Sequence, residues 1–231
     1  MKMGLFRENH RILEPDRGGG ETIVMIHGLF VGAFILRYQA QYFRNAGFRI
    51  FLYDYPTMQY EIPHHAARLT EFLDSPLFNS ERTIHFITHS MGGLLLRGAL
   101  GKLKAERLAA VGRIVMIAPP NRGSDVAALA VRLMPGTEKI VAPIRGLSSE
   151  EDSFANRCPL PDIPSDIGII AAASDYQVRT EYTHLPEEKD HIVLKGTHSG
   201  VLFRRETALQ SEYFIRHGRF RKPEKSEFRS R

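Results

Sequence analysis

The sequence predicts an α/β domain in which a mostly parallel sheet of about six strands has helices on both faces. Three observations predict this class. Apolar, β-branched runs alternate with amphipathic helical segments along the chain. The apolar runs are continuous, which is typical of strands that are buried on both faces. Polar residues that could carry chemistry follow directly after such runs, at the edge where parallel sheets bind ligands.

Strands and helices are expected in alternation after a polar stretch at residues 1–21. The strands are expected at residues 22–26, 48–53, 83–87, 113–117, 167–173 and 191–194. The helices are expected at residues 33–45, 62–73, 91 to about 110, 125–134 and about 205–217. Gly47 and Gly218 follow two of these helices, as is common at helix ends. Because strand and helix alternate, neighbouring strands should run parallel.

Residues 121–165 interrupt this alternation. Five prolines punctuate the segment, and only residues 125–134 show a helical pattern. It is too long for a plain connection in an α/β unit, so it predicts an inserted lid. The 231 residues are enough to bury one full core, and residues 1–218 are expected to form a single domain that includes this lid.

The basic excess of the chain is concentrated at its C-terminal end. Residues 216–231 contain seven Lys or Arg and two Asp or Glu, which accounts for the whole net charge of +5. We expect residues 219–231 to be a flexible, solvated basic tail. No nucleic-acid-binding motif accompanies these charges, so nucleic acid is not expected as a partner.

Features that would direct the protein to a membrane are not evident in the pattern. No apolar run reaches the length that spans a bilayer, and the N-terminal residues show no apolar core of signal-peptide length. The single cysteine, Cys158, excludes an internal disulfide and is expected to be an incidental thiol. These features predict a cytoplasmic protein without stable membrane insertion.

The hexapeptide at residues 88–93, Thr-His-Ser-Met-Gly-Gly, lies between a predicted strand and a predicted helix. A serine on such a turn is forced toward positive φ, which exposes its hydroxyl above a parallel sheet as a nucleophile. Gly92 is the small residue expected two positions after Ser90. Thr88 stands where the G-x-S-x-G motif has its first glycine. The alternative is that Ser90 caps an ordinary helix.

A serine nucleophile needs a histidine to take its proton and an acid to orient that histidine. His198 is placed best for the base, because it follows the last predicted strand among small residues. Asp175 is placed best for the acid, because it follows the strand at 167–173. The alternatives are a surface histidine and a turn-forming aspartate.

The other histidines and carboxylates are expected to have different roles. His64 and His65 are expected to be solvated, His85 to lie in the core, and His89 to pack away from Ser90. Asp54 is expected to be a turn residue, and Asp190 lies at the wrong end of its strand.

Acyl transfer also needs two N–H donors for the oxyanion. One donor should be the backbone N–H of Met91, at the start of the helix that follows Ser90. The other should come from the loop after the first predicted strand, where Gly28 permits a close approach of the backbone. We assign it to Leu29, with Phe30 as the alternative. The same dipeptide, His27-Gly28, could instead be only a strand-ending turn.

The chain resembles the α/β-hydrolase superfamily, and most of all its bacterial esterase and lipase branch. The residues that carry the resemblance are 27–29, 88–93, 118–124, Asp175 and His198. The order Ser90, Asp175, His198 is the order of the triad in that superfamily. The resemblance implies a serine nucleophile, a histidine base, an aspartate that orients it, and hydrolysis of an ester. It also implies that the sheet lacks the first strands of the full fold.

The leading hypothesis is therefore a serine carboxylesterase or lipase-like hydrolase with a small acyl ester as substrate and no metal or cofactor. Apolar residues in the lid and first loop favour an apolar acyl group, although they could equally pack the lid. A thioesterase, amidase or acyltransferase could use the same triad. A third possibility is a non-catalytic binding protein on this scaffold. Oligomeric state is not predicted.

Overall fold

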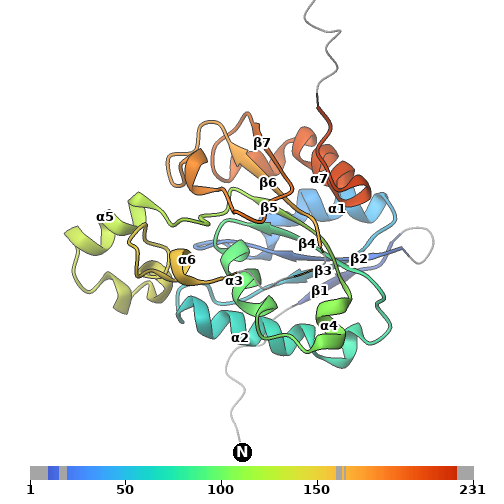
Figure 1. Ribbon diagram of the computed structural model, residues 1–231, viewed down its shortest axis with the longest axis horizontal. Helices are drawn as coiled ribbons and strands as arrows, with labels where there is room; N and C mark the ends of the chain where they lie inside the picture. Colours follow the sequence, from blue (N-terminus) through green and yellow to red (C-terminus); the bar gives the residue numbers. More distant parts are fainter. Residues whose placement is uncertain (1–9, 16–19, 160–162, 164, 223–231) are drawn as a thin grey trace, which may run out of the picture.

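Seven strands form one sheet in the order β1-β3-β2-β4-β5-β6-β7 (Figure 1). The computed structural model describes residues 10–15, 20–159, 163 and 165–222. The strands are β1 (Arg11–Leu13), β2 (Thr22–Ile26), β3 (Arg49–Tyr53), β4 (Ile84–His89), β5 (Val111–Ile117), β6 (Ile167–Ala172) and β7 (Asp190–Leu194). Strands β2 to β7 pair in parallel. The predicted α/β class with a mostly parallel sheet is confirmed.

Strand β1 adds to the six predicted strands. It pairs antiparallel with β3 at the edge of the sheet, with Ile12 opposite Phe51. The prediction that residues 1–21 are a polar stretch before the sheet is therefore wrong for residues 11–13. Three residues on a half-exposed edge are too few to show a strand periodicity in the sequence.

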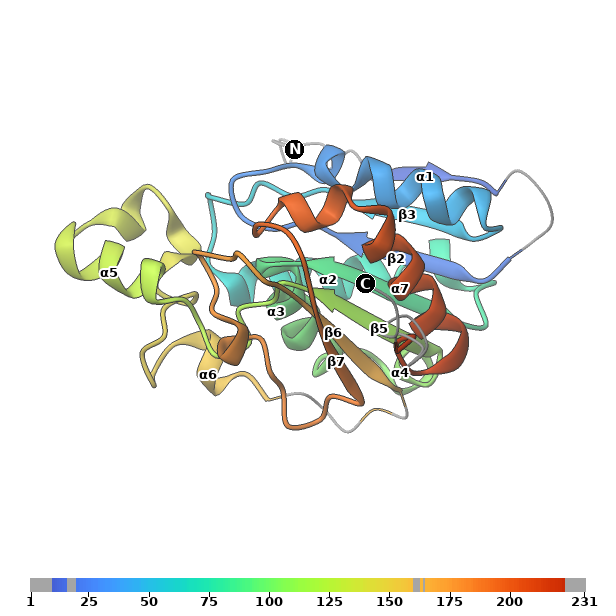
Figure 2. The same ribbon diagram turned by 90° about the horizontal axis from the view of Figure 1, so that it is seen from above.

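Helices cover both faces of the sheet, as Figures 1 and 2 show. Helices α1 (Arg37–Asn45) and α7 (Arg205–His217) lie on one face, and α2 (Ile62–Leu73), α3 (Met91–Leu100) and α4 (Ala105–Ala109) lie on the other. A short 3-10 helix, Ala33–Leu36, precedes α1. The single helix predicted from 91 to about 110 is thus two helices. Gly101, a poor helix former, follows α3 at the break.

Each face of the sheet has its own apolar core. Alternate residues of β2 divide between the two, since successive side chains of a strand point to opposite faces. Val24 and Ile26 pack with α2 and α3, and Ile23 and Met25 pack with α1 and α7. All four side chains are fully buried. These two cores fix the strands whose carboxyl ends carry the candidate site.

The segment of residues 121–165, which we call the lid segment, extends beyond one end of the sheet (Figures 1 and 2). It contains α5 (Asp125–Leu133), α6 (Phe154–Arg157) and 3-10 helices at Thr137–Lys139 and Ala142–Ile144. The buried side chain of Arg97 ties it to α3, donating to the carbonyl oxygens of Asn121, Ala155 and Cys158. Residues 160–162 and 164 of the predicted lid lie outside the described residues.

The domain continues slightly past the boundary predicted at Gly218. Phe220 is buried against Phe214, with ring centroids 4.8 Å apart, and its N–H donates to Asp190. Phe220 of the predicted tail is therefore packed against the domain, and residues 223–231 lie outside the described residues. Within the part of the chain that the structure describes, no helix combines the length and apolarity needed to cross a bilayer.

Candidate active site

Ser90 lies on a sharp turn between β4 and α3. Its φ is +53°, in a region that non-glycine residues rarely adopt. The turn depends on close packing around it. A Cβ on Gly92 would lie 2.6 Å from the carbonyl oxygen of Ile26, and a Cβ on Gly28 would lie 2.8 Å from Cβ of Ser90. Glycine at both positions therefore lets β2, its following loop and α3 meet at the serine.

Thr88 occupies the motif position that usually holds glycine, and the structure shows how it is accommodated. Its side chain is fully buried. Its Oγ1 lies 3.3 Å from the point where a Cβ on Gly93 would stand. The second glycine of the pair at 92–93 thus leaves room for the threonine, and the turn forms despite the altered motif.

The side chains of Ser90, His198 and Asp175 lie in one hydrogen-bonded row. Nε2 of His198 lies 2.9 Å from Oγ of Ser90, and Nδ1 of His198 lies 2.6 Å from Oδ2 of Asp175. Because a carboxylate only accepts, we assign the ring proton to Nδ1, which leaves Nε2 free to accept the serine proton. The three residues that the sequence places after three different strands are therefore brought together.

Asp175 is held as a buried carboxylate. Its side chain is 2% exposed, and its Oδ1 accepts the backbone N–H groups of Gln177 and Val178 at 2.8 and 3.0 Å. Burial raises the pKa of Asp175, but the hydrogen bond and charge of His198 and these two N–H donors outweigh it, so the pKa lies below its ordinary value. The ionised form can therefore orient His198 and stabilise its protonated ring.

The side chain of His89 contacts the backbone of His198. The sequence predicts that His89 packs away from Ser90; its side chain is buried, but it also lines the cavity at Ser90, with its ring centroid 5.0 Å from that of His198. Burial, together with the charge of His198, lowers the pKa of His89 to about 3. The neutral ring faces the carbonyl oxygen of His198 through Nε2, at 3.1 Å, and donates to it. The contact fixes the backbone of the loop that carries His198, which the sequence does not reveal.

The sequence predicts that the backbone N–H groups of Leu29 and Met91 donate to the oxyanion beside Ser90. Within residues 10–15, 20–159, 163 and 165–222, neither N–H has a hydrogen-bond acceptor. The N–H of Phe30, the alternative to Leu29, donates to Oγ1 of Thr57 at 3.2 Å. The geometry thus favours Leu29 over Phe30 as a donor for a bound ligand.

A cavity of about 510 Å³ opens at Ser90 and His198. Its volume lies within the range that binds small organic molecules. One wall is the loop after β2 and the other is the lid segment. The apolar side chains that line it include Leu29, Phe30, Val31, Val126, Ala127, Ala130, Met134, Val141, Ile144 and Leu147. The space beside the serine is therefore suited to an apolar group.

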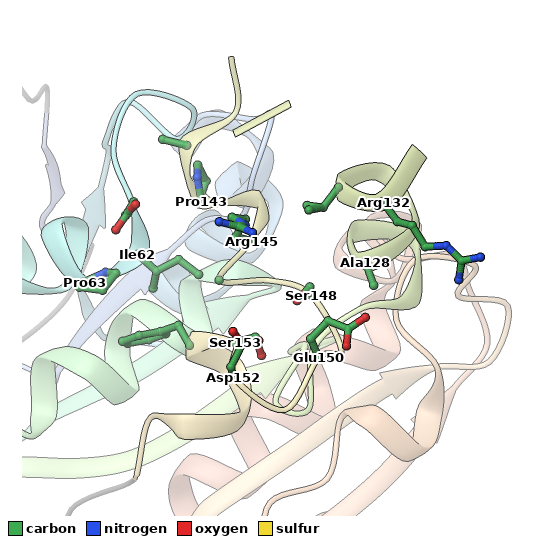
Figure 3. Close-up of a pocket in the computed structure, with 15 residues that line it drawn as sticks. Ile62, Pro63, Ala128, Arg132, Pro143, Arg145, Ser148, Glu150, Asp152 and Ser153 are labelled. Carbon is green, nitrogen blue, oxygen red and sulfur yellow. The ribbon is translucent and has the colours of Figure 1, made fainter. Parts of the chain in front are cut away.

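A second cavity, of about 430 Å³, lies on the other flank of α5. Figure 3 shows Ile62 and Pro63 of α2 on one side of it, and Ala128 and Arg132 of α5 on the other. Among its described lining residues there is no member of the Ser90 row. Helix α5 is therefore a wall between two cavities, and Ala127 is the residue of α5 that is buried.

Two expectations about neighbouring residues are wrong. His65 is fully buried rather than solvated, because α2 turns it toward Tyr55, with ring centroids 4.9 Å apart. Asp54 does more than form a turn, since its Oδ1 lies 2.9 Å from Nε2 of His27 and accepts the N–H of Ala33. Both contacts depend on how α2 and the loop after β2 pack against the segment after β3, so a local pattern could not indicate them. His64 is exposed and His85 is buried, as predicted.

A family model described as "Domain of unknown function (DUF7379)" matches residues 6–132, more than half of the chain. No curated protein matches by sequence.

Solved structures of hydrolases share the fold. The mature lipase BlEst2 of Bacillus licheniformis is 16% identical, with a TM-score of 0.73 over 90% of this chain and 96% of that chain. YbtT, a type II thioesterase from the yersiniabactin pathway, is 15% identical, with a TM-score of 0.63 over 90% and 98%. A monoacylglycerol lipase of Paleococcus ferrophilus is 14% identical, with a TM-score of 0.61 over 91% and 96%. The α/β-hydrolase fold implied by the resemblance is confirmed.

Proposed function

Since the chain belongs to the family described as a domain of unknown function, DUF7379, and has an α/β-hydrolase fold, we propose its activity from its site. We propose that it is a serine hydrolase that cleaves carboxylic esters with an apolar acyl group through an acyl-enzyme. The observation that carries the proposal is the row Ser90–His198–Asp175, with 2.9 and 2.6 Å between its atoms, at the mouth of an apolar cavity.

In the acylation step, Oγ of Ser90 attacks the ester carbonyl carbon while Nε2 of His198 takes the serine proton. The carbonyl oxygen of the ester becomes negative, and the N–H groups of Leu29 and Met91 donate to it. Met91 begins α3, so the helix dipole adds to its donor strength. The protonated His198 then gives its proton to the leaving alcohol, which departs and leaves the acyl group on Ser90.

Deacylation repeats these steps with water in place of the serine. His198 takes a proton from the water, and the resulting hydroxide attacks the acyl carbon. The same two N–H groups hold the second oxyanion. His198 finally returns the proton to Ser90, which restores the enzyme and releases the carboxylic acid. Asp175 keeps the ring of His198 in one tautomer throughout, and it remains ionised.

The cavity supports the preference for an apolar acyl chain. Its walls in the lid segment are mostly apolar, with Ser124 and Thr137 as polar exceptions, and the 510 Å³ of space has room for a chain of several methylenes. A charged acyl group would lose water there without gaining an ion pair, which is costly. We therefore expect kcat/KM to rise with acyl length until the chain fills the cavity.

A thioester is the second candidate substrate. Proteins with similar structures include a type II thioesterase as well as lipases. An oxygen ester and a thioester present the same acyl carbon to Ser90 and differ in their leaving group. Equal acyl chains on oxygen and sulfur therefore separate the two activities.

The test is hydrolysis of p-nitrophenyl esters from acetate to dodecanoate, beside thioesters with the same acyl groups. The wild-type protein should hydrolyse the oxygen esters with a maximum at an intermediate chain length, and Ser90→Ala should abolish this activity. Ser80→Ala, at an exposed serine that precedes β4 and so lies at the opposite end of that strand from Ser90, is the matched control and should retain full activity. Turnover that survives in Ser90→Ala, or none in the wild type, would reject the proposal.

A further inference from the structure

The loop that carries Leu29, residues 27–32, is fastened by one neighbouring segment, residues 54–57. This segment follows β3, which lies beside β2 in the sheet. Hydrogen bonds join the segment to the start of the loop, to its middle and to the residue just after it. In addition, Asp54 lies within ion-pair distance of His27. The segment therefore forms a platform under the loop, and the sequence gives no sign of it because the two stretches are separated by α1 and β3.

Asp54 makes two of these contacts with one oxygen. Its Oδ1 lies 2.9 Å from Nε2 of His27 and 3.0 Å from the backbone nitrogen of Ala33, whose N–H it accepts. His27 opens the loop and Ala33 follows its last residue. The hydrogen bond from His27 lowers the pKa of Asp54, burial opposes this, and the N–H of Ala33 lowers it further. The ionised carboxylate thus joins both ends of the loop.

His27 transmits this constraint to the site. Its side chain is fully buried, and its ring stacks on Tyr55 with 4.4 Å between centroids. The hydroxyl of Tyr55 donates to the carbonyl oxygen of His27 at 2.8 Å. The next residue, Gly28, packs so closely on Ser90 that a Cβ there would lie 2.8 Å from Cβ of Ser90. A movement of His27 would therefore move the backbone beside the nucleophile.

The middle of the loop is strained and needs such support. Phe30 has a φ of +62°, which is costly for a bulky residue, and its N–H is held by Oγ1 of Thr57. With the N–H of Phe30 engaged in this way, the N–H of Leu29 has no acceptor among the described residues and is available to a substrate oxygen. A backbone donor stabilises an oxyanion only when it is already in place, since a displacement of about 1 Å can cost roughly 100-fold in rate.

We propose that Asp54 is a positioning residue that, through His27 and Ala33, holds the N–H of Leu29 in place for the oxyanion. This inference rests on the proposed function, because it concerns the same site. Asp54 touches no reacting atom, so its effect should appear where negative charge develops on the substrate oxygen. Binding of the uncharged ground state should change little.

The experiment compares Asp54→Ala, Asp54→Asn and the wild type with the best p-nitrophenyl ester. Asp54→Ala removes both contacts, and we expect kcat to fall by about 10- to 100-fold with KM within about threefold. Asp54→Asn keeps an amide oxygen that can accept from His27 and Ala33, so it should recover most of kcat. Asp74→Ala, at the C-terminal end of α2, is the matched carboxylate control and should match the wild type.

The inhibition constant Ki of a trifluoromethyl ketone with the same acyl chain is a second measurement, which a general loss of stability would not change. The ketone adds to the serine and places an oxyanion at the two donors, so its Ki should rise by the factor by which kcat/KM falls. The Ki of the corresponding primary alcohol, which carries no oxyanion, should stay unchanged. Circular dichroism establishes that each variant is folded.

The outcomes separate this inference from the proposed function. If wild-type hydrolysis does not depend on Ser90, the proposed function fails first. If it does, and Asp54→Ala keeps kcat within about twofold, the role of Asp54 is rejected alone. A fall in kcat with an unchanged Ki for the ketone would also reject it, because the loss would then arise elsewhere.

Discussion

The carboxyl ends of the strands and the lid segment differ in how tightly their side chains are packed. At the strand ends, Ser90, His198 and Asp175 come from separate loops, yet each is fixed by further contacts, and the Asp175 carboxylate is 2% exposed. In the lid segment, α5 has a cavity on each flank. Three of its apolar residues, Val126, Leu129 and Leu133, are each more than half exposed, although Val126 also lines the cavity at Ser90.

This difference indicates that the strand ends carry the chemistry and that the lid segment binds the acyl chain. Chemistry requires atoms placed to within a fraction of an ångström, so its groups sit on the rigid sheet. A chain of methylenes needs only an apolar wall, which a loosely packed helix can provide. We therefore expect substitutions at the strand ends to alter kcat or stability strongly, and substitutions on α5 to alter mainly the choice of substrate.

The largest effect is expected for the nucleophile and its base. Ser90→Ala and His198→Ala should each lower kcat for a p-nitrophenyl ester by roughly 10⁶-fold, because members of such a row act as a unit. The double variant should be little worse than either alone. Steady-state kinetics checks this, at enzyme concentrations where the variant's turnover exceeds that of contaminating esterases. If the loss in the double variant equalled the product of the two single losses, the two residues would not act as a unit.

A smaller loss is expected for Asp175→Asn, about 10⁴-fold in kcat, because the amide favours the wrong tautomer of His198. This variant also tests stability against pH. The native pKa of Asp175 is lowered, so its charge stabilises the fold above the ordinary aspartate pKa of about 3.9, and that contribution is lost as the pH falls through the native value.

Urea unfolding of the wild type and Asp175→Asn between pH 7 and pH 3 measures this contribution. The wild-type advantage in the free energy of unfolding should shrink toward pH 3. An advantage that stays constant with pH would show that the carboxylate charge adds nothing to stability.

Gly92→Ala at the strand ends and Leu133→Ser on α5 compare the packing of the two regions. The new Cβ would lie 2.6 and 2.7 Å from two backbone oxygens, of Ile26 and His27, so we expect a loss of about 1–3 kcal/mol in the free energy of unfolding. Leu133→Ser on α5, at a side chain that is 65% exposed, should change it by less than about 0.5 kcal/mol. Urea unfolding at pH 7 checks both, and equal losses would contradict the comparison.

A change in substrate preference without a loss of kcat is expected from the lid segment. Ala130 lines the cavity beside Ser90, and Ala130→Phe would fill part of it. We expect kcat/KM for a long acyl ester to fall about tenfold relative to a short one, with kcat for the short ester unchanged. Ala128→Phe, on the flank that faces the other cavity, is the matched control. An equal fall for both esters would show that α5 does not set chain length.

Much of the architecture could be predicted because its signals are local. Continuous apolar runs predicted strands β2 to β7, and the position of Ser90, Asp175 and His198 just after strands predicted that their side chains would converge. A parallel sheet gathers all its carboxyl ends at one edge, so strand assignment alone is enough to bring such residues close.

The remaining features depend on contacts between distant segments. Strand β1 is too short to show a pattern, and its identity as a strand comes from pairing with β3. The roles of Asp54 and His65 depend on which loop or ring lies opposite them in space. Likewise, the preference for Leu29 over Phe30 follows from the bond between Phe30 and Thr57, which joins residues 27 positions apart.

The central claim, an activated serine at position 90, is tested most directly by labelling with a fluorophosphonate probe and mapping the adduct by mass spectrometry. The probe reacts with a serine whose proton is taken by a neighbouring base, so we predict one adduct, on Ser90, that is absent in His198→Ala and after heat denaturation. Labelling in the presence of detergent keeps a closed lid segment from hiding the serine. A folded protein that gives no adduct under either condition, or an adduct on another serine, would contradict the account.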